Sequence, residues 1–210
     1  EQFGRPIAEF GAIQHKLAGM TAHIYAMEAM VYRVGGSIDK MHDHLIESGT
    51  DPLTAEYRAI AEFAMECAIA KVYNTEALDF VVDEALQIHG GMGYSAEMPI
   101  ETLYRNARVN RIYEGTNEIN RMLSVDMLMR KAMKNQIDLM RPALAVAAEL
   151  QEGQVEVALP GEGPYGEARA VLRNLKKASL MLSGAVAKQF IGALREEQEI
   201  LLHLADLFIQ

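Results

Sequence analysis

The sequence predicts an all-α protein, an up-and-down helical bundle followed by the start of a second helical region. Apolar residues recur at steps of three and four over most of the chain, which is the period of an amphipathic helix. The alternating pattern of a strand is nearly absent, and short segments with glycine or proline separate the helical patterns. Because each apolar stripe must be covered by another, we expect long helices that pack antiparallel to their neighbours.

The first predicted helix begins near Ile13 and ends at Gly35 and Gly36, because paired glycines often terminate a helix. A second helix is expected over residues 54–73, after the loop-forming stretch ESGTDPL. A third helix, which can be continuous with the second, is expected to stop at Gly90. Together they supply three apolar stripes for one core.

The second half of the chain predicts a short helix over residues 100–107 and a longer one over residues 117–134. Basic residues in its last turn complement the negative pole of that helix. The stretch LQEGQVEVALPGEGPYGE is rich in Gly and Glu and carries two prolines, which is typical of a linker. Residues 168–210 return to a helical pattern.

These elements predict a three-part organisation. Residues 1–134 form the helical-bundle domain, residues 135–166 a connecting segment with the linker, and residues 167–210 part of an additional helical domain.

The net charge of -9 argues against a nucleic-acid partner. No apolar stretch is long enough for a transmembrane segment. The single cysteine, Cys67, suits a reducing compartment, such as a bacterial cytoplasm or a mitochondrial matrix. The sequence leaves peripheral membrane association open.

One carboxylate stands out in the stretch IYEGTNEINR. Glu114 follows an isoleucine and a tyrosine and precedes Gly115, which would let a ligand approach the backbone. A carboxylate that is buried beside apolar side chains becomes a stronger base, suited to a weakly acidic C–H. From spacing alone, a solvated acid near a helix start explains Glu114 better.

Two further motifs have competing explanations. The stretch QIHGGMG, residues 87–93, can admit a ligand or simply end a helix, and it does not match the dinucleotide fingerprint. The group of His42, Asp43 and His44 lacks further ligands at useful spacing, so we predict no metal site.

The stretches QFGRPIAEFGAIQHKLAGM, QIHGGMGY and RNARVNRIYEGTNEINR, in this order, resemble the acyl-CoA dehydrogenases over residues 1–134, most closely the very-long-chain branch. Gly11, where many relatives have Gln, favours that branch. A weaker likeness extends to REEQEILLHLADLFIQ, near the end of the chain. The resemblance implies an oxidoreductase of fatty acid β-oxidation that uses FAD and a fatty acyl-CoA substrate. It also implies an electron-transfer flavoprotein as acceptor and a homodimer or higher homo-oligomer.

Carried over to these residues, the resemblance makes Glu114 the base that removes the α-proton of the acyl thioester, in a dry pocket between helices, while a hydride leaves the β-carbon for the flavin. Gly115 then lies against the substrate. The residues that the resemblance assigns to FAD are Phe3, Phe10, Gly11, Gln87, Ile88, His89, Gly90, Gly91, Thr116, Asn117 and Glu118, with residues 87–91 meeting the FAD of a neighbouring subunit.

Two other functions remain open beside an acyl-CoA dehydrogenase. A catalytically silent helical scaffold would keep the fold without a flavin, and an acyl-CoA oxidase would use the same base with oxygen as acceptor. We further expect the chain to be the C-terminal part of a longer enzyme and to be inactive alone.

Overall fold

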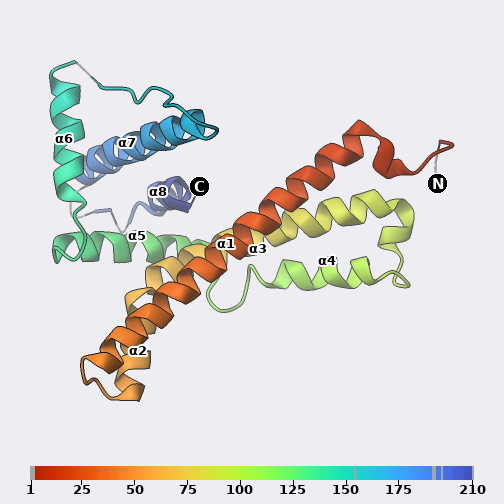
Figure 1. Cartoon of the computed structure of the whole chain (residues 1–210), viewed down its shortest axis with the longest axis horizontal. Helices are drawn as coiled ribbons and strands as arrows, with labels where there is room; N and C mark the ends of the chain where they lie inside the picture. Colours follow the sequence, from red (N-terminus) through yellow and green to blue (C-terminus); the bar gives the residue numbers. More distant parts are fainter. Residues whose placement is uncertain (1–2, 154, 191–192, 195, 210) are drawn as a thin grey trace. The chain divides into compact units, whose positions relative to one another are not determined.

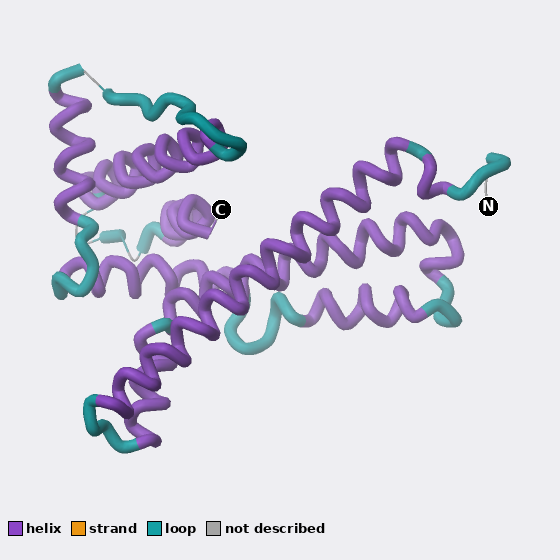
Figure 2. The backbone as a smooth tube through the Cα atoms, in the orientation of Figure 1, coloured by secondary structure: helices purple, strands orange, loops and turns teal. Residues whose placement is uncertain are grey.

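The computed structural model describes residues 3–153, 155–190, 193–194 and 196–209. Within these ranges the chain consists of helices and loops without a β-strand, which confirms the predicted all-α class (Figures 1 and 2). The chain forms two compact units, Glu1–Asn120 and Arg121–Gln210.

The first unit is built on a long antiparallel helix pair. Helices α1 and α3 pack along each other, α2 packs on α1 at the turn between them, and α4 returns along α3 (Figure 1). This arrangement confirms the up-and-down bundle. Its elements are η1 (Ile7–Glu9), α1 (Gly11–Glu47), α2 (Pro52–Glu62), α3 (Ala64–His89), η2 (Gly90–Tyr94), α4 (Pro99–Val109) and the first residues of α5 (Asn117–Met133).

The predicted end of the first helix is wrong. Helix α1 continues through Gly35 and Gly36 to Glu47. A glycine inside a helix costs about 1 kcal/mol relative to alanine. Packing of α1 against both α2 and α3 offsets this cost.

The predicted second helix also differs from the structure. It is interrupted at Phe63, where α2 ends and α3 begins, and α3 then runs without a break through Asn74 to His89. The residues around Phe63 include no glycine or proline that would have marked the interruption. The continuation through Asn74 was one of the two predicted alternatives.

Small side chains bring the helices of the first unit close together. The buried residues of α2 are alanines, and those of α3 are alanines and valines. Val72 of α3 is fully buried at the level where the loop between α4 and α5 meets α3. The core of α2 and α3 consists of Ala55, Ala59, Ala68, Ala70, Val72, Ala77 and Val82.

The second unit contains α6 (Met140–Gln151), α7 (Gly166–Gln189) and α8 (Gln198–Ile209), with α7 in contact with both others. The predicted connecting segment thus contains a helix, and the helical pattern over residues 168–210 corresponds to two helices, α7 and α8. The linker is fastened to α7. Asn174 exchanges two hydrogen bonds with the backbone of Ala158, at 2.8 and 3.0 Å, and Lys177 donates to Glu156 O at 2.7 Å.

Candidate functional site

The loop between α4 and α5 turns on two successive left-handed residues. The φ angle is 57° at Glu114 and 79° at Gly115. A residue other than glycine seldom adopts this conformation, so the backbone of Glu114 needs partners that hold it there. A Cβ atom at Gly115 would lie 3.0 Å from Asn120 Nδ2, so both its conformation and its surroundings favour glycine.

Helix α5 holds the loop from one side. The side-chain amide of Asn120 donates to the carbonyl oxygens of Gly115 at 2.8 Å and Thr116 at 3.1 Å. Thr116 precedes the helix, and its hydroxyl accepts a hydrogen bond from the Ile119 N–H at 3.3 Å. Thr116 is therefore an N-cap, which agrees with the predicted helix start.

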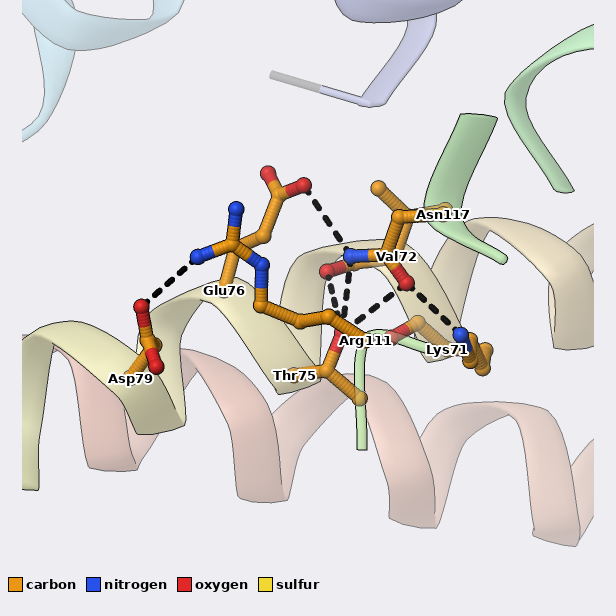
Figure 3. A network of polar contacts seen from close by, with 7 residues as sticks. All are labelled: Lys71, Val72, Thr75, Glu76, Asp79, Arg111 and Asn117. Carbon is orange, nitrogen blue, oxygen red and sulfur yellow. Dashed lines mark hydrogen bonds and ion pairs between the residues drawn. The ribbon is translucent and has the colours of Figure 1, made fainter. Parts of the chain in front are cut away.

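Helix α3 holds the loop from the other side (Figure 3). Lys71 Nζ donates to Gly115 O at 2.8 Å and to Asn117 Oδ1 at 2.7 Å. Asn117 Nδ2 donates to Thr75 Oγ1 and to Glu76 Oε1, both at 3.0 Å. The Asn117 side chain, which is 2% exposed, thus has partners on α3 for both its oxygen and its nitrogen.

An ion pair fixes the start of the same loop. Arg111 Nη1 lies 2.7 Å from Asp79 Oδ2 (Figure 3), and the Asn117 N–H donates to Arg111 O at 3.2 Å. Hydrogen bonds and an ion pair from α3 and α5 therefore surround the backbone on both sides of Glu114.

The network is negatively charged around one ammonium group. Desolvation lowers the pKa of Lys71 from its ordinary value of 10.5, while the carboxylates of Glu118, Glu76 and Glu114 act in the opposite direction. Lys71 is half-buried, so these charges act through a partly desolvated environment. One of the two side chains that donate to the Gly115 carbonyl is thus a cation, and three carboxylates favour its charged form.

The side chain of Glu114 does not lie in a dry pocket within this chain. Glu114 is exposed, and so are its neighbours Ile112 (54%) and Tyr113 (49%). The expectation of a shielded base is therefore not met by the described residues themselves. The polar backbone of the loop is turned toward α3 and α5, which leaves the side chains of residues 112–114 on the outer side.

Three of the predicted FAD residues follow Gly115 directly, and the structure gives them different surroundings. The N–H of Asn117 is used within the chain, and the N–H groups of Ile119 and Asn120 bond to Thr116. These three N–H groups are therefore already bonded within the chain and are not available to a phosphate group of FAD. Glu118 is exposed, whereas Asn117 is buried.

The predicted glycine-rich ligand loop lies at the end of α3. Gly90 has a φ of 61°, and a Cβ at Gly93 would lie 2.6 Å from the carbonyl oxygen of Leu86, so the turn itself requires both. Gly91 differs from both, because its φ is not in the left-handed region and nothing lies within 4 Å of a Cβ there. Gln87, His89 and Gly91 are exposed, Ile88 is half-buried, and His89 Nδ1 lies 2.7 Å from Ala85 O.

The predicted FAD residues near the start of the chain form an aromatic group. The rings of Phe3 and Phe10 meet edge to face with centroids 6.3 Å apart, and the guanidinium of Arg5 lies 4.0 Å from the Phe10 centroid. Phe3 is 88% exposed, and a Cβ at Gly11 would meet nothing within 4 Å. An exposed aromatic ring and two glycines with open surroundings, Gly11 and Gly91, fit contacts to a flat ring such as that of a flavin.

The structure does not bring all predicted cofactor residues to one place. Gly115 is fastened to Lys71, and Gln87 lies 16 positions further along α3, or about 24 Å at 1.5 Å per residue. Residues 87–91 therefore cannot touch the same flavin ring as Glu114 from within one copy of the chain.

Sequence reasoning missed the residues that hold the loop. A signal was present, because Lys71, Thr75 and Asp79 are spaced by four in a helix whose other positions are largely apolar. Such a stripe identifies one polar face of the helix, on which a partner segment can bond. The missed residues are Lys71, Thr75, Glu76, Asp79, Arg111 and Asn120.

Other chemical candidates have ordinary surroundings. Burial, and to a smaller extent Glu66, raises the pKa of the half-buried Cys67 thiol, which disfavours the reactive thiolate. No group of three or more His, Cys, Asp or Glu residues with a metal-binding arrangement occurs among the described residues. In the same ranges, no helix combines the length and apolar character that crossing a membrane requires.

Comparison with known proteins gives matches along the whole chain. Residues 1–129 match the family described as acyl-CoA dehydrogenase, C-terminal domain, and residues 174–210 match a second family of the same description. A probable acyl-CoA dehydrogenase of Bacillus subtilis (strain 168) is 38% identical over 98% of this chain. The human very long-chain specific acyl-CoA dehydrogenase of mitochondria is 40% identical over 58% of it.

All of this chain also matches a solved structure. The crystal structure of an acyl-CoA dehydrogenase complexed with FAD from Bacillus anthracis superposes with a TM-score of 0.92, at 42% identity over 100% of this chain. The chain spans about a third of the two Bacillus proteins, 34% of the B. subtilis relative and 35% of the B. anthracis chain.

Proposed function

Because the chain belongs to the acyl-CoA dehydrogenase family, we propose that it forms the part of a flavin-dependent enzyme that supplies the catalytic base, Glu114. The reaction is the α,β-dehydrogenation of a fatty acyl-CoA thioester. One observation carries the proposal: Glu114 is an exposed carboxylate on a backbone that α3 and α5 hold in a left-handed conformation. A base needs both access to substrate and a fixed position.

In this proposal the Glu114 carboxylate takes the proton from the α-carbon of the thioester, and a hydride leaves the β-carbon, so that a C=C bond forms between the two carbons. Bound FAD supplies the acceptor for that hydride. Gly115 lets the thioester approach the loop, because it carries no side chain on the open side. In a protein of the length of its relatives, we expect other segments to exclude water from Glu114.

The residues that would hold the flavin come from three segments, and two of them, at the start of α1 and the end of α3, lie at the same end of the helix pair, where Lys16 pairs with Glu84. Phe3, Phe10 and Gly11 offer an aromatic ring and open backbone near the start of α1. At the end of α3, Gln87, His89, Gly90 and Gly91 are exposed beside the half-buried Ile88, and we assign these five residues to the flavin of a second subunit. Thr116, Asn117 and Glu118, which follow the base and Gly115 in the sequence, complete the predicted contacts.

The substrate class and the electron acceptor extend the proposal. The 40% identity to the human very long-chain enzyme favours a long acyl chain. The family resemblance favours an electron-transfer flavoprotein as acceptor and a homo-oligomer as the working form.

The decisive experiment is Glu114→Gln in the flavin-loaded protein. Glutamine keeps the shape of the side chain but cannot accept the proton, so reduction of the flavin by palmitoyl-CoA should fall by about 10³-fold or more while flavin content is retained. Stopped-flow absorbance of the flavin measures the rate. Glu56→Gln, an exposed acid on α2, is the matched control and should reduce at the wild-type rate. A wild-type rate in Glu114→Gln would overturn the assignment.

A further inference from the structure

We propose that Lys71 is a positioning residue for the base. Its ammonium group holds the backbone on the C-terminal side of Glu114, so that the carboxylate is presented in one orientation to a substrate. This inference rests on the proposed function of Glu114 and assigns a role to a side chain on a different helix.

The geometry places Lys71 at the point where the loop needs support. Its Nζ lies 2.8 Å from Gly115 O and 2.7 Å from Asn117 Oδ1, so one group bonds to the residue after the base and to the first residue of α5. Asn120 Nδ2 reaches the same Gly115 carbonyl from α5, also at 2.8 Å. The carbonyl thus accepts from two helices at once, which fixes the plane of the peptide between Gly115 and Thr116.

The conformation of the loop explains why this support matters. Glu114 and Gly115 are both left-handed, and Gly115 has the widest choice of backbone angles of any residue type. Without the bond from Lys71, the Gly115 peptide would lose one of its two donors and could rotate. Glu114 and Gly115 are joined by a peptide bond, so a rotation at Gly115 also moves the backbone of Glu114.

Charge makes the support specific to a cation. The carboxylates of Glu118, Glu76 and Glu114 favour the charged form of Lys71, and its ammonium group donates to two acceptors. A neutral apolar side chain of similar length offers neither bond. An arginine keeps the charge and several donors, although its planar group is larger.

The test compares Lys71→Met with Lys71→Arg in the flavin-loaded protein. Lys71→Met should reduce its flavin about 10- to 100-fold more slowly at saturating palmitoyl-CoA, because a displaced base reacts poorly. Flavin content and the palmitoyl-CoA concentration for half-maximal rate should stay within about twofold of wild type, and Lys71→Arg should recover part of the rate. A merely structural role would not separate the rate from binding in this way.

A second readout isolates proton removal. An acyl-CoA analogue with sulfur in place of the β-carbon cannot lose a hydride, so exchange of its α-protons with deuterated water, followed by NMR, reports on the base alone. Lys71→Met should slow this exchange by the same factor as it slows flavin reduction. If Lys71→Met does not fold, Lys71→Gln, which is shorter and uncharged, is measured by the same two readouts.

The control is Lys177→Met. Lys177 is also half-buried, pairs with Glu149 and donates to the backbone carbonyl of Glu156, but it lies in the second unit. Its replacement should leave flavin reduction unchanged.

The outcomes separate the two proposals. Full activity in Lys71→Met, or an equal loss of flavin content and of reduction rate, overturns the positioning role. If Glu114→Gln is inactive in the same experiments, the proposed function still stands. Full activity in Glu114→Gln overturns both.

Discussion

Asn117 is the residue whose interpretation changes most between sequence and structure. The family resemblance places it at a cofactor contact, and that assignment stays a prediction. In the structure its side chain bonds to Lys71, Thr75 and Glu76, its N–H bonds to Arg111, and it is 2% exposed. Its side chain therefore holds the loop in place, and any contact of Asn117 with the flavin would come from its backbone.

We expect Asn117→Ala to lower the free energy of unfolding by about 2 kcal/mol, because it leaves half-buried partners on α3 without their hydrogen bonds. Urea unfolding followed by circular dichroism measures the change. Asn106→Ala, at an exposed position of α4, is the control and should alter the unfolding free energy by less than about 0.5 kcal/mol. Equal midpoints for the two variants would contradict the structural role of Asn117.

At the scale of the element, periodicity predicted where helices occur better than where they end. The apolar stripe of α1 was plain in the sequence, but its continuation past Gly35 and Gly36 depends on packing against α2 and α3. The interruption at Phe63 has no turn residue to mark it. Helix ends are set by contacts from distant parts of the chain as much as by local residues, and one sequence does not reveal these contacts.

Local residues do define the N-terminus of α2. Asp51 precedes Pro52, and its carboxylate accepts a hydrogen bond from the Thr54 N–H at 3.1 Å. Hydrogen bonds from the side chain and then the backbone of Thr54 lower the pKa of Asp51 from its ordinary value of 3.8. Because the folded-state pKa is depressed, the stabilisation by this cap is fully present above pH 3.8 and is lost as pH falls through the folded-state pKa.

We therefore expect an NMR titration of the Asp51 carboxyl group to give a midpoint below 3.8. Asp51→Asn keeps a capping side chain but does not titrate, so the stability advantage of wild type over this variant should shrink as pH falls below 3.8. Thermal unfolding from pH 7 to pH 2.5 measures the difference. A constant difference across this range would show that the cap does not depend on the ionised carboxylate.

For the whole molecule, the sequence predicted the all-α class and the candidate base, but it could not predict what holds that base. Lys71 and Gly115 lie 44 positions apart, and Thr75 and Asn117 lie 42 apart. Such pairs are set by the way α3 passes the loop, which local spacing does not encode. The polar stripe on α3 identifies the face on which a partner can bond, without indicating which segment bonds there.

The distance along α3 has a consequence for the assembled protein. The Glu114 loop is fastened at Lys71, whereas the turn with Gly91 lies at the far end of the helix, about 24 Å away by helix rise. If both contact a flavin ring, they serve different flavins, and in a symmetric oligomer each site combines the base of one subunit with the turn of another. A defect in the base of one subunit and a defect in the turn of its partner should then affect the same site and leave the other site intact.

Complementation between inactive variants tests this arrangement. Gly91→Trp fills the open space at the turn and should block the flavin site that this turn serves, while Glu114→Gln removes the base. Each variant alone should be inactive. Coexpressed with two different affinity tags and purified through both, the mixed dimer should regain one intact site and about half of the wild-type activity. If the turn instead contacts the flavin of its own subunit, every site in the mixed dimer carries one defect, and no activity will return.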